Sequence, residues 1–387
     1  AIAKFIFDSG IWPRASITAG FVLSFVLCRT EVQLLGDGYT WLAIFGNGGY
    51  YISKWAEQGG IWLLRAIQMA LGGYTMETAL LAFQITSIFS GAVYVYLSII
   101  LVREFVGSPK SRLLGTVLLW GSGMILMFFG YVEFYPPLWP VAILYVIAVK
   151  RGLTDSRWAF ASALILAIGT LMHAQMIILS PGLVFMIVHR LQSPILKLQF
   201  LTTLSVLCLI GFAGLWLVMR NPETAIMLLP YFTGRSIAPD YAVFSLIHVA
   251  DLFELTMIVC PLVFSLLTNT RFSSARHFDS TTAVLALMSL GSMTFLVLYG
   301  AAITMARDWD VMAFGLLAPV LLLIHAYRSP DNELPSRLLL ATCLTGILLT
   351  ASYTATCTTV PAAENRFFSI LNERTRSGYV VLSNYYA

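Results

Sequence analysis

Charged residues are scarce in this sequence. Asp, Glu, Lys and Arg make up 11% of the 387 residues, whereas an ordinary soluble domain carries about 25%. Hydrophobic residues make up 58% of the chain, so there are too few charged side chains to cover a water-facing surface. The composition therefore excludes a soluble enzyme and a disordered chain, and it leaves a polytopic membrane protein.

Cysteine and the common chemical motifs are also scarce or missing. Five cysteines do not make a disulfide framework, and no CxxC, HExxH or clustered His and Cys pattern indicates a metal centre. Neither a glycine-rich phosphate loop nor a serine nucleophile elbow is present. The net charge is only +4, with Lys and Arg scattered singly, which argues against nucleic acid as a partner.

Long apolar runs are abundant instead. A spanning helix needs about 20 mainly apolar residues, and continuous runs of this length are not typical of barrel strands. Residues 1–356 are expected to form one transmembrane domain, and residues 357–387 a short outer C-terminal tail. We predict an all-α polytopic membrane protein with about 11 transmembrane helices, over residues 12–29, 78–102, 113–130, 134–149, 158–172, 174–189, 198–219, 244–268, 282–304, 311–327 and 338–356.

The first outer loop, residues 30–77, contains a short amphipathic segment. Between Ile61 and Leu71 the apolar residues are interspersed with Arg65 and Gln68, and two glycines end the segment. It is too short to span a membrane, so we expect a helix that lies in the plane of the interface.

The distribution of Lys and Arg predicts the orientation. If the N-terminus is cytoplasmic, eleven spans place the C-terminus outside, and the inner segments hold 14 of the 23 basic residues but only six of the 19 acids. Every short inner loop then carries at least two basic residues. We expect an integral protein of a bacterial inner (plasma) membrane in this orientation.

In this topology the notable ionisable residues gather at the outer boundary. An ionisable group at such a depth is costly unless it is paired or faces a cavity. Because they come from five different loops or helix ends, they predict a shared polar cavity that opens outward. The residues are Asp37, Glu133, His173, His248, Asp251, Glu254, Arg307, Asp308 and Asp310.

Asp37 and Glu133 are the candidate acids of this cavity. Asp37 stands between two glycines, which let the backbone turn sharply and leave the carboxylate uncovered as a general base. The alternative is a turn residue that caps the next helix. Glu133 stands at the tip of a tight hairpin and must find a partner or a ligand. Tyr131 and Tyr135 beside it could stack on a sugar, or they could belong to an interfacial aromatic belt.

The run Arg307-Asp308-Trp309-Asp310 is the strongest local motif. Arg307 can hold two phosphate oxygens at once. Asp308 and Asp310 can orient the arginine or bind a divalent cation. The alternative is a capped helix start with a local ion pair.

The histidines have two interpretations each. His173, next to Gln175 at the tip of a hairpin, is either a pocket residue or a structural donor. His248, Asp251 and Glu254 are spaced by three and therefore share one helical face. That face either lines the cavity or forms the amphipathic first turns of a span.

These features together resemble the GT-C superfamily of glycosyltransferases over most of the chain. The resemblance rests on an acid in a long first outer loop, Asp37, and on the flat helix after it, residues 61–71. Gly-Tyr-Val-Glu-Phe-Tyr-Pro, His173 before Pro181, and Arg-Asp-Trp-Asp are similar to patterns of poorly characterised bacterial members. In one respect the sequence departs from the family, because many members pair the first-loop acid with a second one, whereas Gly38 follows Asp37 here.

The resemblance implies a transferase that moves a sugar from a polyprenyl-phosphate-linked donor to an acceptor on the outer face. Asp37 would be the catalytic base, and Arg307 would hold the lipid phosphate, directly or with a cation on Asp308 and Asp310. The implied partners are membrane lipids, the polyprenyl-phosphate sugar and other membrane subunits. Candidate substrate-binding residues are Glu133, Tyr131, Tyr135, His173, His248 and Asp251.

Two other functions fit the same composition. Many GT-C members carry a soluble outer domain that binds the acceptor, whereas only residues 357–387 follow the last predicted span here. A non-catalytic GT-C-like subunit of a larger assembly would fit that difference. A transporter or flippase of lipid-linked or anionic solutes would also gather charges, but transporters usually show an internal repeat and polar residues at mid-membrane. The sequence shows no such repeat.

Overall fold

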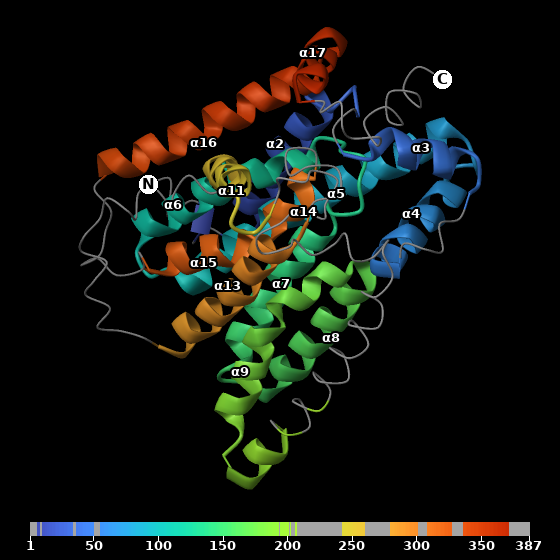
Figure 1. The fold of residues 1–387 in the computed structure, drawn as a ribbon. Helices are drawn as coiled ribbons and strands as arrows, with labels where there is room; N and C mark the ends of the chain where they lie inside the picture. The colour runs from blue at the N-terminus through green and yellow to red at the C-terminus, as the bar shows by residue number, and fades with distance from the viewer. Residues whose placement is uncertain are drawn as a thin grey trace.

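The computed structural model describes residues 6–7, 10–33, 36–49, 55–192, 194–200, 202, 206, 242–259, 279–300, 308–326 and 336–370. The elements it forms there are helices, in agreement with the all-α prediction (Figure 1). In chain order they are α2 (Ile11–Leu27), α3 (Gly38–Gly46), η1 (Trp55–Glu57), α4 (Gln58–Ala70), α5 (Met76–Phe105), α6 (Pro109–Trp120), η2 (Gly123–Phe128), α7 (Leu138–Gly152), α8 (Ser156–Met172), η3 (Ala174–Leu179), α9 (Ser180–Arg190), α11 (Leu246–Val259), α13 (Ser280–Leu298), α14 (Trp309–Phe314), α15 (Leu317–Ala326), α16 (Ser336–Cys357) and α17 (Val360–Ile370).

Several of these helices are apolar enough for a membrane. Three stretches among the described residues are also long enough to cross it: Met76–Phe105, Ser280–Leu298 and Trp309–Ala326. Shorter apolar helices are Ile11–Leu27, Ser111–Trp120, Ser156–Met172 and Ala174–Arg190. The predicted class, a helical membrane protein, is confirmed, while the total of 11 spans stays a prediction. Most of the predicted span 198–219, residues 260–268 of the span 244–268 and the end of the tail, 371–387, lie outside the described residues.

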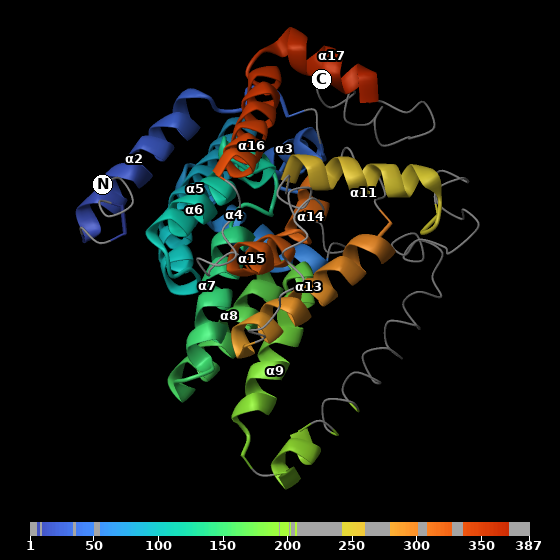
Figure 2. The same ribbon diagram turned by 90° about the vertical axis from the view of Figure 1, so that its left-hand side faces the viewer.

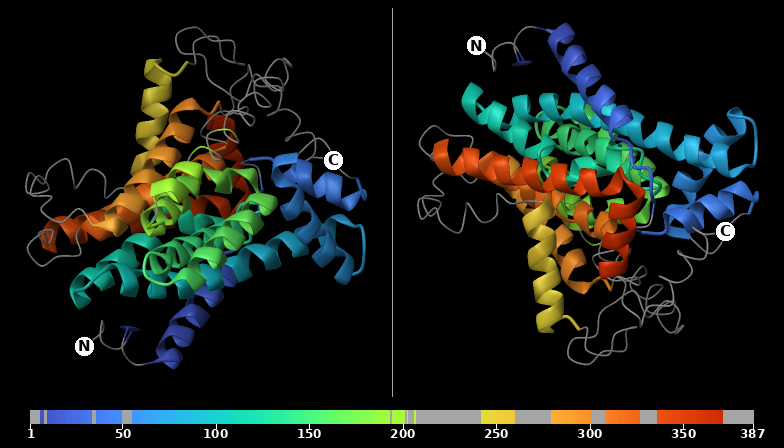
Figure 3. Two further views of the ribbon diagram at one scale, coloured as in Figure 1. Left: turned by 90° about the horizontal axis from the view of Figure 1, so that it is seen from below. Right: turned by 90° about the horizontal axis from the view of Figure 1, so that it is seen from above.

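The 30-residue helix α5 runs from the side of the molecule that carries α3 and α4 to the opposite side (Figures 1 and 3). Its first turn is capped by Thr75, whose hydroxyl accepts from the Thr78 N–H at 3.1 Å. Small residues on its buried face let neighbouring segments approach closely. At Gly91, a Cβ atom would lie 2.5 Å from Cβ of Phe128 and 2.6 Å from the ring of Phe25. Glycine there lets α2 and η2 pack directly on the α5 backbone.

Three predicted spans each divide into two helical segments, and each of them carries or adjoins a predicted site residue. The span 113–130 divides into α6 and the 3-10 helix η2, just before Tyr131. The span 174–189 divides into η3 and α9, just after His173. The span 311–327 divides into α14, which carries Asp310, and α15. A continuous helix was the wrong prediction for 113–130, because irregular backbone is tolerated at membrane depth where protein covers it, and η2 is buried throughout. Ala174–Arg190 and Trp309–Ala326 remain single apolar stretches in which the type of helix or its regularity changes.

The first loop forms a small helical layer, α3 and α4, against the start of α5 (Figure 1). The predicted amphipathic helix is confirmed as α4, in which Ile61 is buried and Trp62 is 61% exposed. The preceding helix, α3, is not evident in the sequence pattern. Its Trp41 and Phe45 pack with Ile61 in one hydrophobic cluster. Arg65 of α4 joins the two helices, because its guanidinium donates to the Phe45 carbonyl at 2.9 Å and lies over the Phe45 ring.

The helix α7 runs from one end of the bundle toward the other and lies beside α8 and α9 (Figure 2). Glu133 comes a few residues before its start, and Arg151 lies in its last turn, about 20 Å away along the axis. At that far end Arg151 pairs with Glu104 of α5, and Arg190 of α9 donates to the carbonyl of Gly152. These basic residues therefore lie at the end of the bundle opposite the predicted site. The cytoplasmic location of that end of the bundle stays a prediction.

Candidate active site

The segment from Tyr131 to Tyr135 connects η2 to α7, and its side chains alternate between two sides. Val132 and Phe134 enter the hydrophobic cluster formed by α3, α4 and α5. Tyr131 and Tyr135 belong instead to the main core of the bundle. Glu133, between Val132 and Phe134, faces the same side as the two tyrosines and is only 6% exposed. The pattern Tyr-x-Glu-x-Tyr thus places one carboxyl group between two aromatic rings.

Glu133 joins this segment to the first loop. Its Oε1 accepts a hydrogen bond from the backbone N–H of Asp37 at 3.0 Å. Asp37 occupies the N-cap position of α3, yet its own side chain makes no capping hydrogen bond. The half-buried Asp37 side chain therefore does not perform the capping role that was the alternative, and its role as a base stays a prediction.

Two buried side chains fix the backbone that carries Glu133. The hydroxyl of Ser87, from α5, accepts from the N–H groups of Gly130 (3.0 Å) and Tyr131 (3.2 Å). Gln33, from the loop after α2, accepts from the Val132 N–H at 3.2 Å through its side-chain oxygen. Consecutive N–H groups are thus held from two sides. The position of Glu133 follows from residues 46 to 100 positions away in the chain.

His173 forms a second part of the site at the end of α8. Its Nδ1 accepts from the backbone N–H of Gln175 at 3.1 Å, so a neutral ring carries its proton on Nε2. That nitrogen lies 3.7 Å from Oε1 of Glu57, and the His173 ring packs on Tyr135 with centroids 4.8 Å apart. The Gln175 side chain donates to the carbonyl of Val311 at 2.5 Å, which ties this turn to α14.

The start of α14 forms the third part. Asp310 is 2% exposed, and its carboxylate accepts from the next backbone N–H at 2.9 Å and faces the Tyr131 hydroxyl. Trp309 packs on Tyr131 with ring centroids 5.7 Å apart. Asp308 precedes the helix at its N-cap position without a capping side-chain hydrogen bond. Arg307 lies outside the described residues.

The carboxyl groups of Asp310, Asp37 and Glu57 therefore lie close to that of Glu133, in a region with little access to water. Burial raises the pKa of Glu133 well above its ordinary value. The nearby carboxylates of Asp310, Asp37 and Glu57 raise that pKa further, whereas the hydrogen bond from the Asp37 N–H lowers it. Burial, and next the charge of Asp310, likewise raise the pKa of the Tyr131 hydroxyl. Glu133 thus keeps its proton to a higher pH than an exposed glutamate and can donate a hydrogen bond.

Other predicted site residues are not drawn into this group by the contacts that the structure defines. His248 and Asp251 lie in α11, which packs against α14 and α16. His248 is fully buried, with Nδ1 3.0 Å from the Val243 carbonyl at the start of its own helix. Their role in substrate binding stays a prediction.

Metal binding by Asp308 and Asp310 also stays a prediction. Within the described part of the chain, no group of three or more His, Cys, Asp or Glu side chains is arranged to hold an ion. Asp310 already accepts a backbone hydrogen bond through one of its oxygens.

Some residues of the site are not evident from the sequence. Glu57 is a buried acid just before α4, in the first loop where the GT-C resemblance leads one to expect a second acid. Tyr299, directly after α13, faces Asp308. Ser87 and Gln33 act on the backbone of distant segments, and nothing in their local sequence indicates this.

The sequence matches no known family model and no curated protein. The structure, however, is similar to two crystal structures of ArnT from Cupriavidus metallidurans. The apo structure matches with a TM-score of 0.52 at 15% identity, over 92% of this chain and 68% of the ArnT chain. The structure bound to undecaprenyl phosphate matches with a TM-score of 0.50 at 14% identity, over 96% and 75% of the two chains. ArnT is a GT-C polyprenyl-phosphate-sugar glycosyltransferase, so the fold of this chain is similar to that of a GT-C enzyme, in agreement with the resemblance of its sequence.

Proposed function

We propose that this protein is a membrane glycosyltransferase that moves a sugar from a polyprenyl-phosphate-linked donor to an acceptor at the outer membrane face. One observation carries the proposal: three separate segments of the chain bring Asp37, Glu133 and Asp310 close together. The carboxylate of Asp37 makes no capping hydrogen bond there. The fold supports it, because one of the similar ArnT structures holds undecaprenyl phosphate.

The chemistry needs a base and a way to stabilise the departing phosphate. Asp37 takes the proton of the acceptor hydroxyl while the acceptor oxygen bonds to the anomeric carbon of the sugar. The bond from that carbon to the phosphate oxygen breaks, and its electron pair leaves with the polyprenyl phosphate. Arg307, next to Asp308 in sequence, is the candidate to bind that phosphate.

Glu133 has two tasks in this scheme. Its Oε1 fixes the backbone of Asp37, and its retained proton lets it donate a hydrogen bond to a sugar oxygen. Tyr135 and His173, whose rings pack together, lie beside Glu133 on the same side of the sugar site.

Asp37→Asn tests the proposal. The amide keeps the size of the side chain but cannot act as a base, so transfer in liposomes supplied with undecaprenyl-phosphate-linked sugars should be abolished while the protein remains folded. Asp155→Asn is the matched control, because Asp155 is a true helix cap that accepts from the Arg157 N–H at 2.9 Å. Equal turnover of wild type and Asp37→Asn would refute the base role. A wild type that binds undecaprenyl phosphate but transfers nothing would favour a non-catalytic subunit.

A further inference from the structure

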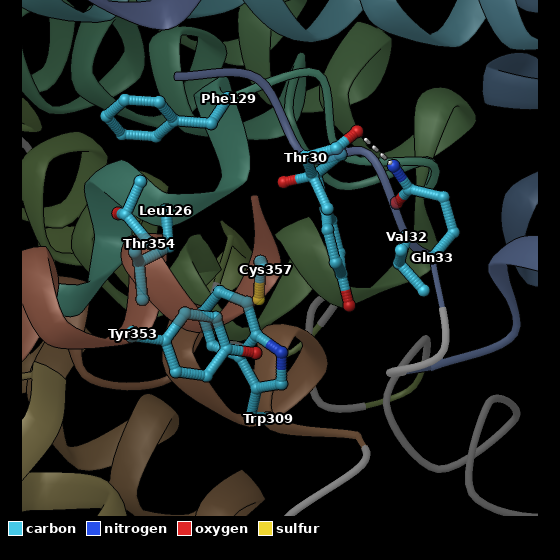
Figure 4. A pocket seen from close by; sticks show the side chains of 10 residues that line it. Thr30, Val32, Gln33, Leu126, Phe129, Trp309, Tyr353, Thr354 and Cys357 are labelled. Atoms are coloured by element: carbon cyan, nitrogen blue, oxygen red, sulfur yellow. Dashed lines mark hydrogen bonds between the residues drawn. The ribbon is translucent and has the colours of Figure 1, made fainter. Parts of the chain in front are cut away.

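Beside the carboxylates lies a pocket with an aromatic wall. The rings of Tyr131 and Trp309 have centroids 5.7 Å apart, and those of Trp309 and Tyr353 are 5.8 Å apart. Tyr353 comes from α16, so the wall joins three segments that are distant in the chain. Figure 4 shows the Tyr353 and Trp309 side chains side by side at this wall.

The polar atoms of the wall are buried, and they make no hydrogen bond to the described part of the chain. These atoms are Nε1 of Trp309 and the hydroxyl oxygens of Tyr353 and Tyr131. The Tyr131 hydroxyl, however, faces the Asp310 carboxylate, which can accept a hydrogen bond from it. A buried polar atom normally has a partner, so the two such atoms on Trp309 and Tyr353 indicate a group that enters the pocket.

Two other polar side chains of the lining, Gln33 and Thr354, have partners. Gln33 donates to the Thr30 carbonyl at 3.0 Å and accepts from the Val132 N–H. The Thr354 hydroxyl donates to the Thr350 carbonyl at 2.9 Å. Among the described residues of the lining, the buried side-chain atoms that lack a hydrogen bond therefore lie on the aromatic wall.

The size and chemistry of the pocket define what it can take. Its cavity volume is about 20 Å³, which is room for one water-sized group and not for a sugar ring. An indole N–H only donates, so it cannot bind an ammonium group, and the neighbouring Asp310 disfavours an anion. A hydroxyl group fits, because it accepts from the Trp309 N–H while it exchanges a hydrogen bond with a tyrosine.

We propose that this pocket, the Trp309–Tyr353 pocket, binds one hydroxyl group of the sugar that is transferred, and thereby selects sugars that carry that hydroxyl. The inference rests on the proposed function. The pocket shares Tyr131 and Trp309 with the carboxylate site, and Asp310 is the next residue in the chain. A sugar held at Glu133 can therefore extend one substituent into it.

The selectivity between sugars arises because a sugar that lacks the hydroxyl leaves the Trp309 N–H and the Tyr353 hydroxyl without a hydrogen-bond partner. A site built to hydrogen-bond a substrate hydroxyl rejects the deoxy analogue far more strongly than an apolar pocket rejects a change of shape. We expect wild type to favour the parent sugar over one deoxy analogue by more than about 100-fold in kcat/KM. Analogues that lack a hydroxyl elsewhere on the ring should be affected much less.

Trp309→Phe and Tyr353→Phe test this, since each removes one polar atom and keeps an aromatic ring. The matched control is Tyr145→Phe, whose buried hydroxyl donates to the Leu179 carbonyl at 3.0 Å in another part of the core. The substrates are undecaprenyl-phosphate-linked hexoses and pentoses, with the singly deoxygenated analogues of each sugar that is transferred. Both pocket variants should reduce the preference at least about tenfold by losing activity on the parent sugar, and Tyr145→Phe should keep it.

Equal loss on the parent sugar and on every analogue, or no loss at all, would overturn the proposal. Melting temperatures provide a second check. Tyr353→Phe should melt no lower than wild type if its hydroxyl serves a sugar, because the variant loses only an unsatisfied group. A lower melting temperature would mean that the hydroxyl holds a structural water, which also contradicts the proposal.

The transferase proposal can fail while the pocket proposal holds, and a binding experiment distinguishes the two outcomes. If wild type transfers none of the sugars, free methyl glycosides and their deoxy analogues are tested for thermal stabilisation of the protein. Stabilisation that requires one hydroxyl and disappears in Tyr353→Phe would support the pocket without the transferase. Absence of any stabilisation would overturn the pocket as well.

Discussion

Replacing Glu133 with glutamine should change how the stability of this protein depends on pH. Glutamine keeps the shape of the side chain and an oxygen that accepts from the Asp37 N–H, but it removes the ionisable group. In the wild type, burial raises the pKa of Glu133 well above its ordinary value, and the acids Asp310 and Asp37 raise it further. The folded protein therefore holds a proton that the unfolded chain releases at lower pH.

The sign and size of the effect follow from this difference. Below the ordinary glutamate pKa both states are protonated and Glu133 causes no loss of stability. As the pH rises toward the raised pKa of the folded state, the free energy of unfolding of the wild type should fall relative to Glu133→Gln. One proton of difference gives a slope of up to about 1.4 kcal/mol per pH unit within this window. The variant should therefore become progressively more stable than wild type.

Thermal unfolding in detergent at several pH values and constant ionic strength measures the difference. Glu77→Gln serves as the control, because Glu77 is exposed in the first turn of α5 and its replacement should leave the pH profile unchanged. Parallel profiles of wild type and Glu133→Gln would refute the reasoning. A pairing of Glu133 with a cation such as Arg307 would give the opposite sign, with wild type gaining stability as the pH rises.

Hydropathy predicts most of the helices because it depends on local composition. The helices α2, α5, α8, α13 and α16 lie close to predicted spans. Hydropathy cannot locate η2, because residues 121–123 are small and raise no polar signal, although they end α6. The same limit applies at α14, where the chain stays apolar across the interruption at Gly315. These interruptions place Tyr131 and Asp310, so the sequence alone leaves their geometry undefined.

The site is predictable where its pattern is local. Glu133 and its two flanking tyrosines share a period of two, and in the structure the Glu133 carboxyl group lies near both tyrosines. Glu57 has no such pattern, since its neighbour His173 comes more than one hundred residues later. Tyr353 lies in an apolar helix, where a tyrosine is indistinguishable from a packing residue until Trp309 is seen beside it.

Two further predictions concern the phosphate and the backbone of the site. Arg307→Lys should weaken the binding of undecaprenyl phosphate at least about tenfold, because a point charge cannot replace a two-pronged hydrogen bond; equal affinities in a titration would remove the phosphate role. Ser87→Ala should both destabilise the protein and slow transfer, because it leaves the buried N–H groups of Gly130 and Tyr131 without their acceptor. An unsatisfied buried group costs about 1–3 kcal/mol, so the loss of unfolding free energy should reach several kcal/mol. Ser98→Ala on the same helix is the matched control, since the Ser98 hydroxyl only donates to the Tyr94 carbonyl within α5 and its removal exposes no N–H. If the two variants lose equal stability in thermal unfolding, Ser87 acts only as a small packing residue, and the backbone of Glu133 is fixed by other contacts.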